Sequence, residues 1–204
     1  MKLNPQFSEM LSVNHPSVTL DNVFTEEECL QIIQIGKAAG LSDSALVSTI
    51  IDESIRKSKN SFLVPSEETR WIFEKIMGAL EWANEFYFQF DLCGFANMQY
   101  TEYGPDNDYY DWHCDMEFGQ VDVPTNMVMQ SRKLSASVIL CNRDEYIGGD
   151  LYVLRDHENN PINITPQSVG SMVVFPSYID HKVSPVTEGT RHSLVIWVLG
   201  PKFK

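Results

Sequence analysis

Long apolar runs are missing from this chain. The sequence has 204 residues and 43% apolar content, but no uninterrupted apolar stretch approaches the roughly 20 residues that a membrane-spanning helix needs. Residues 1–20 place Lys2, Asn4, Glu9 and Pro16 among the apolar positions, which leaves no continuous signal-peptide core. We therefore expect no membrane partner and a cytoplasmic location.

Cysteine is scarce and scattered. The chain has four cysteines, Cys29, Cys93, Cys114 and Cys141, and none of them forms a Cys-x-x-Cys pair. This spacing fits a reduced intracellular compartment better than a disulfide framework.

Basic residues are also few. Lysine and arginine number 15 against 28 aspartates and glutamates, and the net charge is -13. Non-specific nucleic-acid binding needs clustered positive charge, so we expect no nucleic-acid partner. The acidic charge permits a basic protein or peptide partner, although acidic charge more commonly serves solubility alone.

Internal repeats and low-complexity segments are absent as well, and the length suits one sizeable core. We expect one domain over residues 1–204, with a helical N-terminal support over about 1–90 and a β core over about 91–204.

Two helices are predicted in the N-terminal part. Thr25 is a plausible N-cap, Glu28 completes a capping box, and Gly40 ends this helix. The second is predicted to open at residues 65–68 (Pro-Ser-Glu-Glu). Its apolar stripe, which we assign to core packing, consists of Trp71, Ile72, Ile76, Leu80 and Ala83.

After Phe90 the pattern changes to short strands. Alternating or β-branched segments cover 97–103, 133–140, 150–154, 172–175 and 192–199. Many short strands separated by turns indicate a sandwich or jelly roll. Helices that precede strands, without βαβ alternation, argue against a parallel sheet. We predict a mainly β jelly roll with N-terminal helices, in which residues 117–130 form a loop.

Two histidines and an aspartate form the most informative pattern. Residues i and i+2 of a strand share a face, so His113 and Asp115 can reach one metal while Cys114 points away. His181 must then come from a strand distant in sequence. Two imidazoles and a carboxylate suit a non-haem Fe(II) centre with open positions. His-x-Asp alone is weak support, and His181 alone would more simply be a hydrogen-bonded core residue.

An arginine follows the second histidine by ten residues. Arg191 and Ser193 share a strand face, and a guanidinium pairs with a carboxylate through two parallel hydrogen bonds. Beside the His–Asp–His pattern, this pair predicts a clamp for a dicarboxylate cosubstrate, and hence an oxygenase that consumes 2-oxoglutarate. The alternative for Arg191 is a surface salt bridge with Glu188.

Tyrosines precede His113 at short range. A phenol can donate to a carboxylate while its ring walls a pocket. We take Tyr103 as the first candidate for cosubstrate contact and Tyr110 as the second. Aromatic packing at a strand end is the alternative for each.

These motifs together resemble a known family. They are Tyr103-Gly104, Tyr110, His113-x-Asp115, Gly148-Gly149-Asp150, Phe175-Pro176-Ser177, His181-x-Val183-x-Pro185-Val186, Gly189-x-Arg191 and Trp197. The pattern resembles the 2-oxoglutarate/Fe(II) oxygenases of prolyl 4-hydroxylase type, and looks nearest to the microbial and phage PKHD-type hydroxylases. The resemblance extends from about Phe24 to the C-terminus and is dense only over residues 98–197.

The resemblance implies a double-stranded β-helix with Fe(II) held by His113, Asp115 and His181. It implies that Arg191 binds the distal carboxylate of 2-oxoglutarate, with Tyr103 assisting. O2 would be the second cosubstrate and ascorbate a candidate reductant. Many eukaryotic prolyl hydroxylases carry lysine at the position of Arg191, and here the chain agrees with the microbial branch instead.

The resemblance also implies a substrate, a prolyl residue in a peptide or protein segment. Trp197 would flank the proline, and Arg132 would help to bind the peptide. Because the loop over residues 117–130 directly follows His113 and Asp115, we expect it to cover the prolyl residue. Ordinary core packing is the alternative for Trp197, and a solvated surface position is the alternative for Arg132. The oligomeric state stays open.

Two other functions compete with this one. The first is an oxygenase that acts on a free amino acid, another side chain or a nucleobase. Nucleic-acid demethylases of this superfamily usually place a second arginine six residues after the clamp, where this chain has Trp197. The second is a jelly-roll protein that binds metal without turnover.

Overall fold

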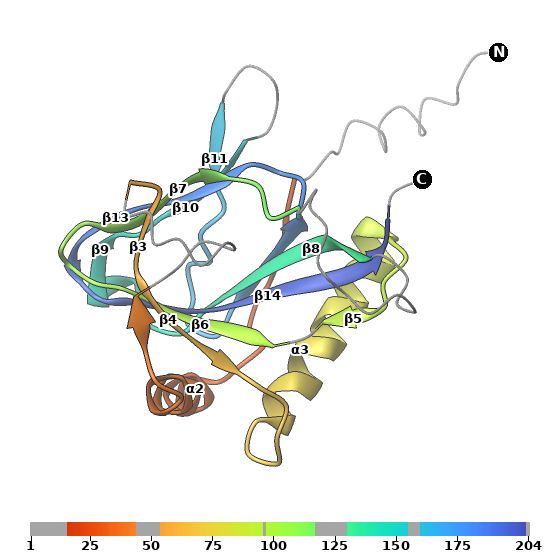
Figure 1. Ribbon diagram of the computed structural model, residues 1–204, viewed down its shortest axis with the longest axis horizontal. Helices are drawn as coiled ribbons and strands as arrows, with labels where there is room; N and C mark the ends of the chain where they lie inside the picture. Colours follow the sequence, from red (N-terminus) through yellow and green to blue (C-terminus); the bar gives the residue numbers. More distant parts are fainter. Residues whose placement is uncertain (1–15, 44–53, 96, 117–129, 155–159, 203–204) are drawn as a thin grey trace.

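Two antiparallel sheets lie face to face and form the body of the protein. The structure, a computed structural model, describes residues 16–43, 54–95, 97–116, 130–154 and 160–202. Within these ranges the strands make an eight-stranded sheet and a six-stranded sheet. Both helices cover the outer face of the larger sheet, and the smaller sheet covers its other face (Figure 1). The predicted loop over 117–130 lies outside the described residues, apart from Gln130.

The larger sheet runs in the order β1-β12-β8-β14-β6-β4-β2, with β5 beside β14. Its strands are β1 (Val18–Leu20), β2 (Ser42–Asp43), β4 (Lys59–Leu63), β5 (Gly94–Phe95), β6 (Met98–Tyr103), β8 (Gln130–Ile139), β12 (Met172–Pro176) and β14 (Arg191–Pro201).

The smaller sheet runs in the order β11-β10-β13-β7-β3, with β9 beside β13. Its strands are β3 (Arg56–Lys57), β7 (Asp108–His113), β9 (Tyr146–Gly148), β10 (Leu151–Leu154), β11 (Pro161–Asn163) and β13 (His181–Gly189). From β6 onward the chain passes several times between the two sheets, as in a jelly roll. The predicted mainly β fold with N-terminal helices is confirmed.

The side chains of strand β14 point alternately to the two sides of the larger sheet. Leu194, Ile196 and Val198 point toward the helices and belong to the larger hydrophobic core. Arg191 and Ser193 alternate with them and face the smaller sheet, where they line a cavity. This alternation follows from the two-residue period of a strand. It separates an apolar core on one side of the larger sheet from a partly polar cavity on the other.

The first helix, α2 (Glu26–Ala38), begins as the sequence predicts. The Glu28 carboxylate accepts the Thr25 N–H at 2.8 Å, and the Thr25 hydroxyl accepts the Glu28 N–H at 3.3 Å. This reciprocal pair satisfies two backbone donors that a helix start would otherwise leave free.

The second helix, α3 (Arg70–Ala83), begins later than predicted. The Thr69 hydroxyl donates to the Val64 carbonyl oxygen at 2.7 Å, and the Ser66 N–H donates to the Thr69 hydroxyl at 3.0 Å. These side-chain bonds hold residues 66–69 in a turn ahead of the helix. A π-helical turn, η1 (Asn84–Phe88), follows α3.

The apolar stripe of α3 is confirmed at Ile72, Ile76, Leu80 and Ala83, which are all buried, while Trp71 is partly buried and meets the Phe24 ring edge-on. No described helix is both long and apolar enough to cross a membrane.

The N-terminal part also contributes strands that the sequence analysis did not anticipate. β1, β2 and β4 join the larger sheet, and β3 joins the smaller one. Two of these strands, β2 and β3, have only two residues each. So short a segment has no period that sequence reasoning could detect, and its partners lie far away in the chain.

A glycine sets the distance between α2 and the larger sheet. A Cβ atom at Gly36 would overlap the ring of Tyr100, which is fully buried. The Ser61 hydroxyl of β4 donates to the Gly36 carbonyl oxygen at 2.6 Å. The helix backbone therefore rests directly on β4 and β6, and β6 carries Gln99 and Tyr103 of the cavity.

This contact predicts the effect of adding one methyl group. Gly36→Ala should lower the free energy of unfolding by about 1–3 kcal/mol, because close-packed cores cannot absorb the extra carbon without displacement. Gly78→Ala is the matched control, since nothing lies within 4 Å of a Cβ at that exposed position of α3, and it should be neutral or stabilising. Urea unfolding of both variants measures the difference, and equal stability of the two would contradict the packing argument.

Candidate active site

Two histidines that are distant in sequence face each other across neighbouring strands. His113 ends β7 and His181 begins β13, and their Cα atoms are direct partners in the antiparallel ladder. The two rings lie with centroids 4.1 Å apart. Pairing of β7 with β13 therefore brings together the two imidazoles that the sequence singles out.

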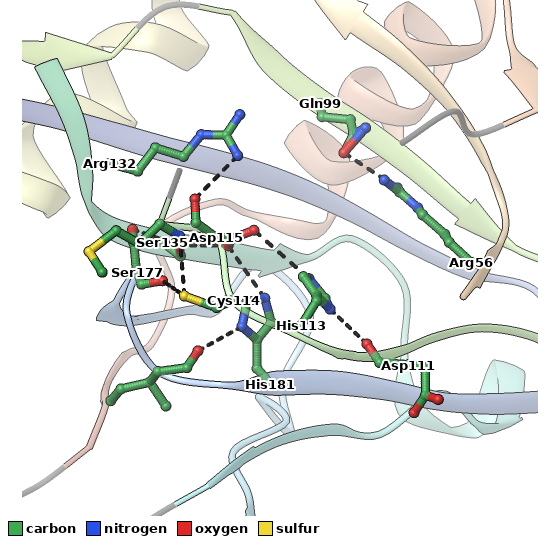
Figure 2. Close-up of polar contacts among 12 residues, drawn as sticks. Arg56, Gln99, Asp111, His113, Cys114, Asp115, Arg132, Ser135, Ser177 and His181 are labelled. Carbon is green, nitrogen blue, oxygen red and sulfur yellow. Dashed lines mark hydrogen bonds and ion pairs between the residues drawn. The ribbon is translucent and has the colours of Figure 1, made fainter. Parts of the chain in front are cut away.

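Asp115 reaches the histidines by a different route from the one expected. β7 ends at His113, so Asp115 does not share a regular strand with it. Instead, the backbone N–H groups of Asp115 and Met116 both donate to the Ser177 carbonyl oxygen, at 3.1 and 3.0 Å. The carboxylate then lies 3.8 Å from Nε2 of His113 and 3.3 Å from Nε2 of His181 (Figure 2).

Backbone carbonyl groups orient both imidazoles. Nδ1 of His113 lies 2.7 Å from the Asp111 carbonyl oxygen, and Nδ1 of His181 lies 3.0 Å from the Ile179 carbonyl oxygen. With Nδ1 as the donor in each ring, Nε2 presents its lone pair toward Asp115. The potential ligand atoms of the three residues all lie within 4.8 Å of one another, and such outer hydrogen bonds are typical of metal-ligating histidines.

The pKa values of the three groups suit cation binding. Burial, reinforced by the charge of His181, lowers the pKa of His113 to about 3, so its imidazole is neutral at neutral pH. Burial opposes ionisation of Asp115, but His181, His113 and the Ser135 hydroxyl hold the pKa of its carboxyl below the ordinary value. Burial also opposes protonation of His181, but the Asp115 carboxylate raises its pKa. A metal cation in this cluster would compete with that proton.

Two serines that sequence reasoning missed hold Asp115 in place. The Ser135 hydroxyl donates to Oδ2 of Asp115 at 2.6 Å, and it lies 2.9 Å from the Ser177 hydroxyl. A signal was present, since Ser135 and Ser137 alternate with the apolar Leu134, Ala136 and Val138 along β8. Cys114 lies outside the cluster, and its thiol donates to the Ser177 carbonyl oxygen at 3.3 Å.

Arg191 is the most unusual buried side chain of the cavity. It is 1% exposed and stands opposite Tyr103 in the β6–β14 ladder. Its Nη1 donates to the Ser193 hydroxyl at 2.9 Å, and its guanidinium lies 5.5 Å from the centre of the Tyr103 ring. Within the described residues its Nε is buried without a hydrogen-bond partner, and no carboxylate pairs with it. The alternative of a surface salt bridge with the exposed Glu188 is therefore wrong.

A glycine turn encloses the Arg191 side chain. Gly149 has a φ of 63°, and a Cβ atom there would lie 2.8 Å from Cδ of Arg191. A buried charge without a counter-charge costs several kcal/mol. The position of Arg191 therefore implies an anionic ligand in this cavity.

The other predicted residues surround the same space. The ring of Tyr110 stacks on His113 at 3.4 Å, and burial raises the pKa of Tyr110 to about 12, so its phenol can donate. Trp197 stands opposite Ser135 in the β8–β14 ladder, and its buried indole N–H has no partner among the described residues. Arg132 stacks over the Trp197 ring at 4.4 Å and reaches the Asp115 carbonyl oxygen at 3.5 Å.

One cavity thus joins the cluster, the buried arginine and the aromatic side chains. The residues that line it are Arg56, Gln99, Tyr103, Tyr110, His113, Asp115, Ser135, Ala136, Ser137, Leu151, Phe175, His181, Val183, Arg191, Ser193, Val195 and Trp197. Sequence reasoning missed Arg56 and Gln99. Arg56 reaches the cavity through the pairing of the two-residue strand β3 with β7, and no sequence motif predicts that pairing.

A match to a sequence family identifies the proteins to which this chain is related. The model described as the 2OG-Fe(II) oxygenase superfamily matches residues 98–199, which hold the whole cluster and Arg191. The chain belongs to this superfamily. Membership implies Fe(II), 2-oxoglutarate and O2, and the His–Asp–His cluster that such chemistry requires is present in this oxygenase.

Curated relatives of this oxygenase carry the name PKHD-type hydroxylase. One from Nitrosomonas eutropha is 26% identical over 186 residues, which cover 89% of this chain and 77% of the relative. One from a Janthinobacterium species is 32% identical over 92 residues, which cover 45% of this chain but only 38% of the relative.

Solved structures show the shared fold. A prolyl hydroxylase from Trichoplax adhaerens, in complex with a hypoxia inducible factor oxygen degradation domain peptide fragment, has a TM-score of 0.73 at 17% identity and covers 94% of this chain and 86% of its own. A Pseudomonas putida prolyl-4-hydroxylase has a TM-score of 0.67 at 20% identity and covers 96% and 97%.

The hydrogen bond from Ser135 to Asp115 predicts a role in metal affinity. Ser135→Ala should weaken binding of Mn(II), used as a redox-stable probe, by roughly 10–100-fold, as removal of such outer partners commonly does. Asp115→Ala should abolish specific binding. Ser137→Ala, at the next inward position of β8, is the control and should bind normally. Titration followed by electron paramagnetic resonance gives the affinities; equal Mn(II) binding by the Ser135 and Ser137 variants would refute the role.

Proposed function

We propose that this protein is an Fe(II)- and 2-oxoglutarate-dependent dioxygenase that hydroxylates a C–H bond. The observation that carries the proposal is the shared cavity of the His–Asp–His cluster and the buried Arg191. Neither feature would suffice alone, since clusters of this kind also hold structural ions and buried arginines also join salt bridges. Together they provide a place for a metal and, beside it, a place for an anion.

His113, Asp115 and His181 are the proposed metal ligands. Two neutral imidazoles and one carboxylate suit Fe(II) and leave positions free for other ligands. With iron, 2-oxoglutarate and O2 bound, this centre would supply the oxidising chemistry that converts a C–H bond to an alcohol and releases succinate and CO2. The role of the protein is to hold the three ligands rigidly, which the carbonyl oxygens of Asp111 and Ile179 and the Ser135 hydroxyl support.

Arg191 is the proposed partner of the distal 2-oxoglutarate carboxylate. Its Nε is a buried donor without a partner in the described part of the chain, and its Nη1 is already aligned by Ser193. A carboxylate would complete the planar fork and neutralise the buried charge. Tyr103 walls the same end of the cavity, and the protonated phenol of Tyr110 lies closer to the metal ligands.

A prolyl residue in a peptide is the substrate that we favour. In support, the relatives carry the name PKHD-type hydroxylase and the structural neighbours include prolyl hydroxylases. Trp197 lines the cavity, and its indole N–H, which has no partner among the described residues, is available to a peptide carbonyl; Arg132 packs on the Trp197 ring. Proline presets its backbone, so an extended peptide would lose little entropy on binding. Ascorbate is the reductant to include in assays.

The clamp assignment predicts a selective kinetic defect. Arg191→Ala should raise the KM for 2-oxoglutarate about tenfold or more, because a charge-assisted hydrogen bond contributes roughly 1.5–3 kcal/mol. Arg191→Lys should also be impaired, since an ammonium cannot form the two-pronged contact. Succinate release measures the KM, and Mn(II) binding should survive in both variants. An unchanged KM would place the clamp elsewhere, and absence of succinate release from the wild-type protein would favour a metal-binding protein without turnover.

The substrate assignment predicts that Trp197 affects coupling. Trp197→Ala should impair hydroxylation of proline-containing peptides far more than it impairs uncoupled conversion of 2-oxoglutarate to succinate. Trp82→Ala is the control, since that side chain is exposed on α3. Mass spectrometry of a peptide pool reports the oxygen gained. Equal loss of both activities would make Trp197 a core residue, and no oxygenated proline in a broad pool would end the prolyl assignment while leaving the wider oxygenase function.

A further inference from the structure

A second buried arginine, Arg56, lies in the same cavity and has no place in the functions assigned above. It belongs to β3, pairs with Tyr110 in the smaller sheet and is 7% exposed. Its guanidinium stacks 4.7 Å from the centre of the Tyr110 ring, and that ring stacks at 3.4 Å on His113. Arg56 is therefore one aromatic ring away from a proposed metal ligand.

All of the contacts that hold Arg56 are with neutral groups. Nε donates to the Ser58 hydroxyl at 2.9 Å, and Nη2 makes a long bond of 3.4 Å to the Gln99 side-chain oxygen. In the described part of the chain, Nη1 has no hydrogen-bond partner and no carboxylate pairs with the guanidinium. A cation removed from water is stabilised only partly by hydroxyl, amide and ring contacts.

The charges that line the cavity leave Arg56 uncompensated. Apart from the two histidines, the charged residues among its lining are Arg56, Arg191 and Asp115. Asp115 and 2-oxoglutarate together carry three negative charges, which Fe(II) and Arg191 would balance. Among the groups that line this cavity, one positive charge then remains at Arg56.

The position of Arg56 separates it from the cosubstrate end of the cavity. Gln99, its partner, stands opposite Val195, four residues along β14 from Arg191, which corresponds to roughly 13 Å. Trp197 is only two residues beyond Val195 on the same strand. Through Gln99, Arg56 therefore lies nearer along β14 to Trp197 than to Arg191.

We propose that Arg56 forms an anion-binding subsite, and that the substrate carries a carboxylate close to the carbon that is hydroxylated. The inference rests on the proposed function, because it uses the cavity around the metal ligands as the substrate site. The carboxylate has two possible sources, an acidic side chain next to the target residue of a peptide, or the α-carboxylate of a free amino acid or chain end. Both would pair with Nη1 and complete the charge balance.

Paired probes test the subsite without turnover. The full-length protein is saturated with Mn(II) and 2-oxoglutarate, and binding is measured by ligand-observed nuclear magnetic resonance. One pair is acetylproline and acetylprolinamide, and another is a capped peptide with Pro-Asp and its Pro-Asn counterpart. The same pairs with leucine in place of proline separate the carboxylate from the prolyl ring. The variants are Arg56→Gln, Arg56→Lys and, as a charge-matched control at an exposed position, Arg70→Gln.

At least one acidic probe should bind the wild-type protein about tenfold or more tightly than its amide, a difference of about 1.4 kcal/mol. Arg56→Gln should remove this preference, Arg56→Lys should keep part of it, and Arg70→Gln should keep all of it. The preferred pair identifies the source of the carboxylate.

The subsite would be overturned if no wild-type pair showed a preference for the carboxylate probe, or if Arg56→Gln kept that preference undiminished. It would also be overturned if Arg56→Gln lost affinity for 2-oxoglutarate as much as for the acidic probe, because Arg56 would then belong to the cosubstrate site. Normal 2-oxoglutarate binding by Arg56→Gln also shows that the variant is folded. Failure of the wild-type protein to bind Mn(II) or 2-oxoglutarate would instead refute the proposed function, and a preference confined to the leucine pairs would refute only the prolyl substrate.

Discussion

Antiparallel pairing of β7 with β13 is the constraint on which the rest of the site depends. It sets His113 opposite His181, and a slip of one residue would turn one imidazole to the other face of the sheet. The ladder is irregular just beyond this pair, with register shifts between His181 and Val183 and between Val183 and Val186. The pairing of the two proposed ligands, His113 and His181, is thus kept in register, and the Ser177 carbonyl oxygen positions the third, Asp115, from the neighbouring segment.

The larger sheet links the stability of the protein to the geometry of its cavity. β14 places Leu194 and Ile196 in the core under the helices and Arg191 and Trp197 on the opposite face. Because interiors are close-packed, a shift of α2 on the sheet moves both faces together. The close packing of Gly36 against Tyr100 therefore supports the cavity, although this contact lies on the opposite side of the sheet.

The charge of the cavity is opposite in sign to the net charge of the chain. The protein as a whole is strongly acidic, yet the cavity contains two buried arginines, and Asp115 is the acidic residue that lines it. An acidic surface repels anions at long range, but salt screens that effect within about 8–10 Å. Inside the cavity the short-range field of the arginines and of a bound metal dominates, which favours small anions that enter between the sheets.

The sequence by itself determined the parts that depend on a few neighbouring residues. The capping box at Thr25 and Glu28, the buried stripe of α3 and the alternation of β8 and β14 follow from local sterics and periodicity, and each is present. The order of His113, Asp115, His181 and Arg191 was informative because the residue types needed to bind a metal and a carboxylate are few.

Only the tertiary structure decided how distant segments meet. The carbonyl oxygen of Ser177 places Asp115, the hydroxyl of Ser135 supports it, and the pairing of β3 with β7 brings Arg56 beside the proposed metal ligands. These contacts join residues whose own neighbours carry no signal of the partner, because the energy of a long-range contact belongs to the pair and not to either segment alone.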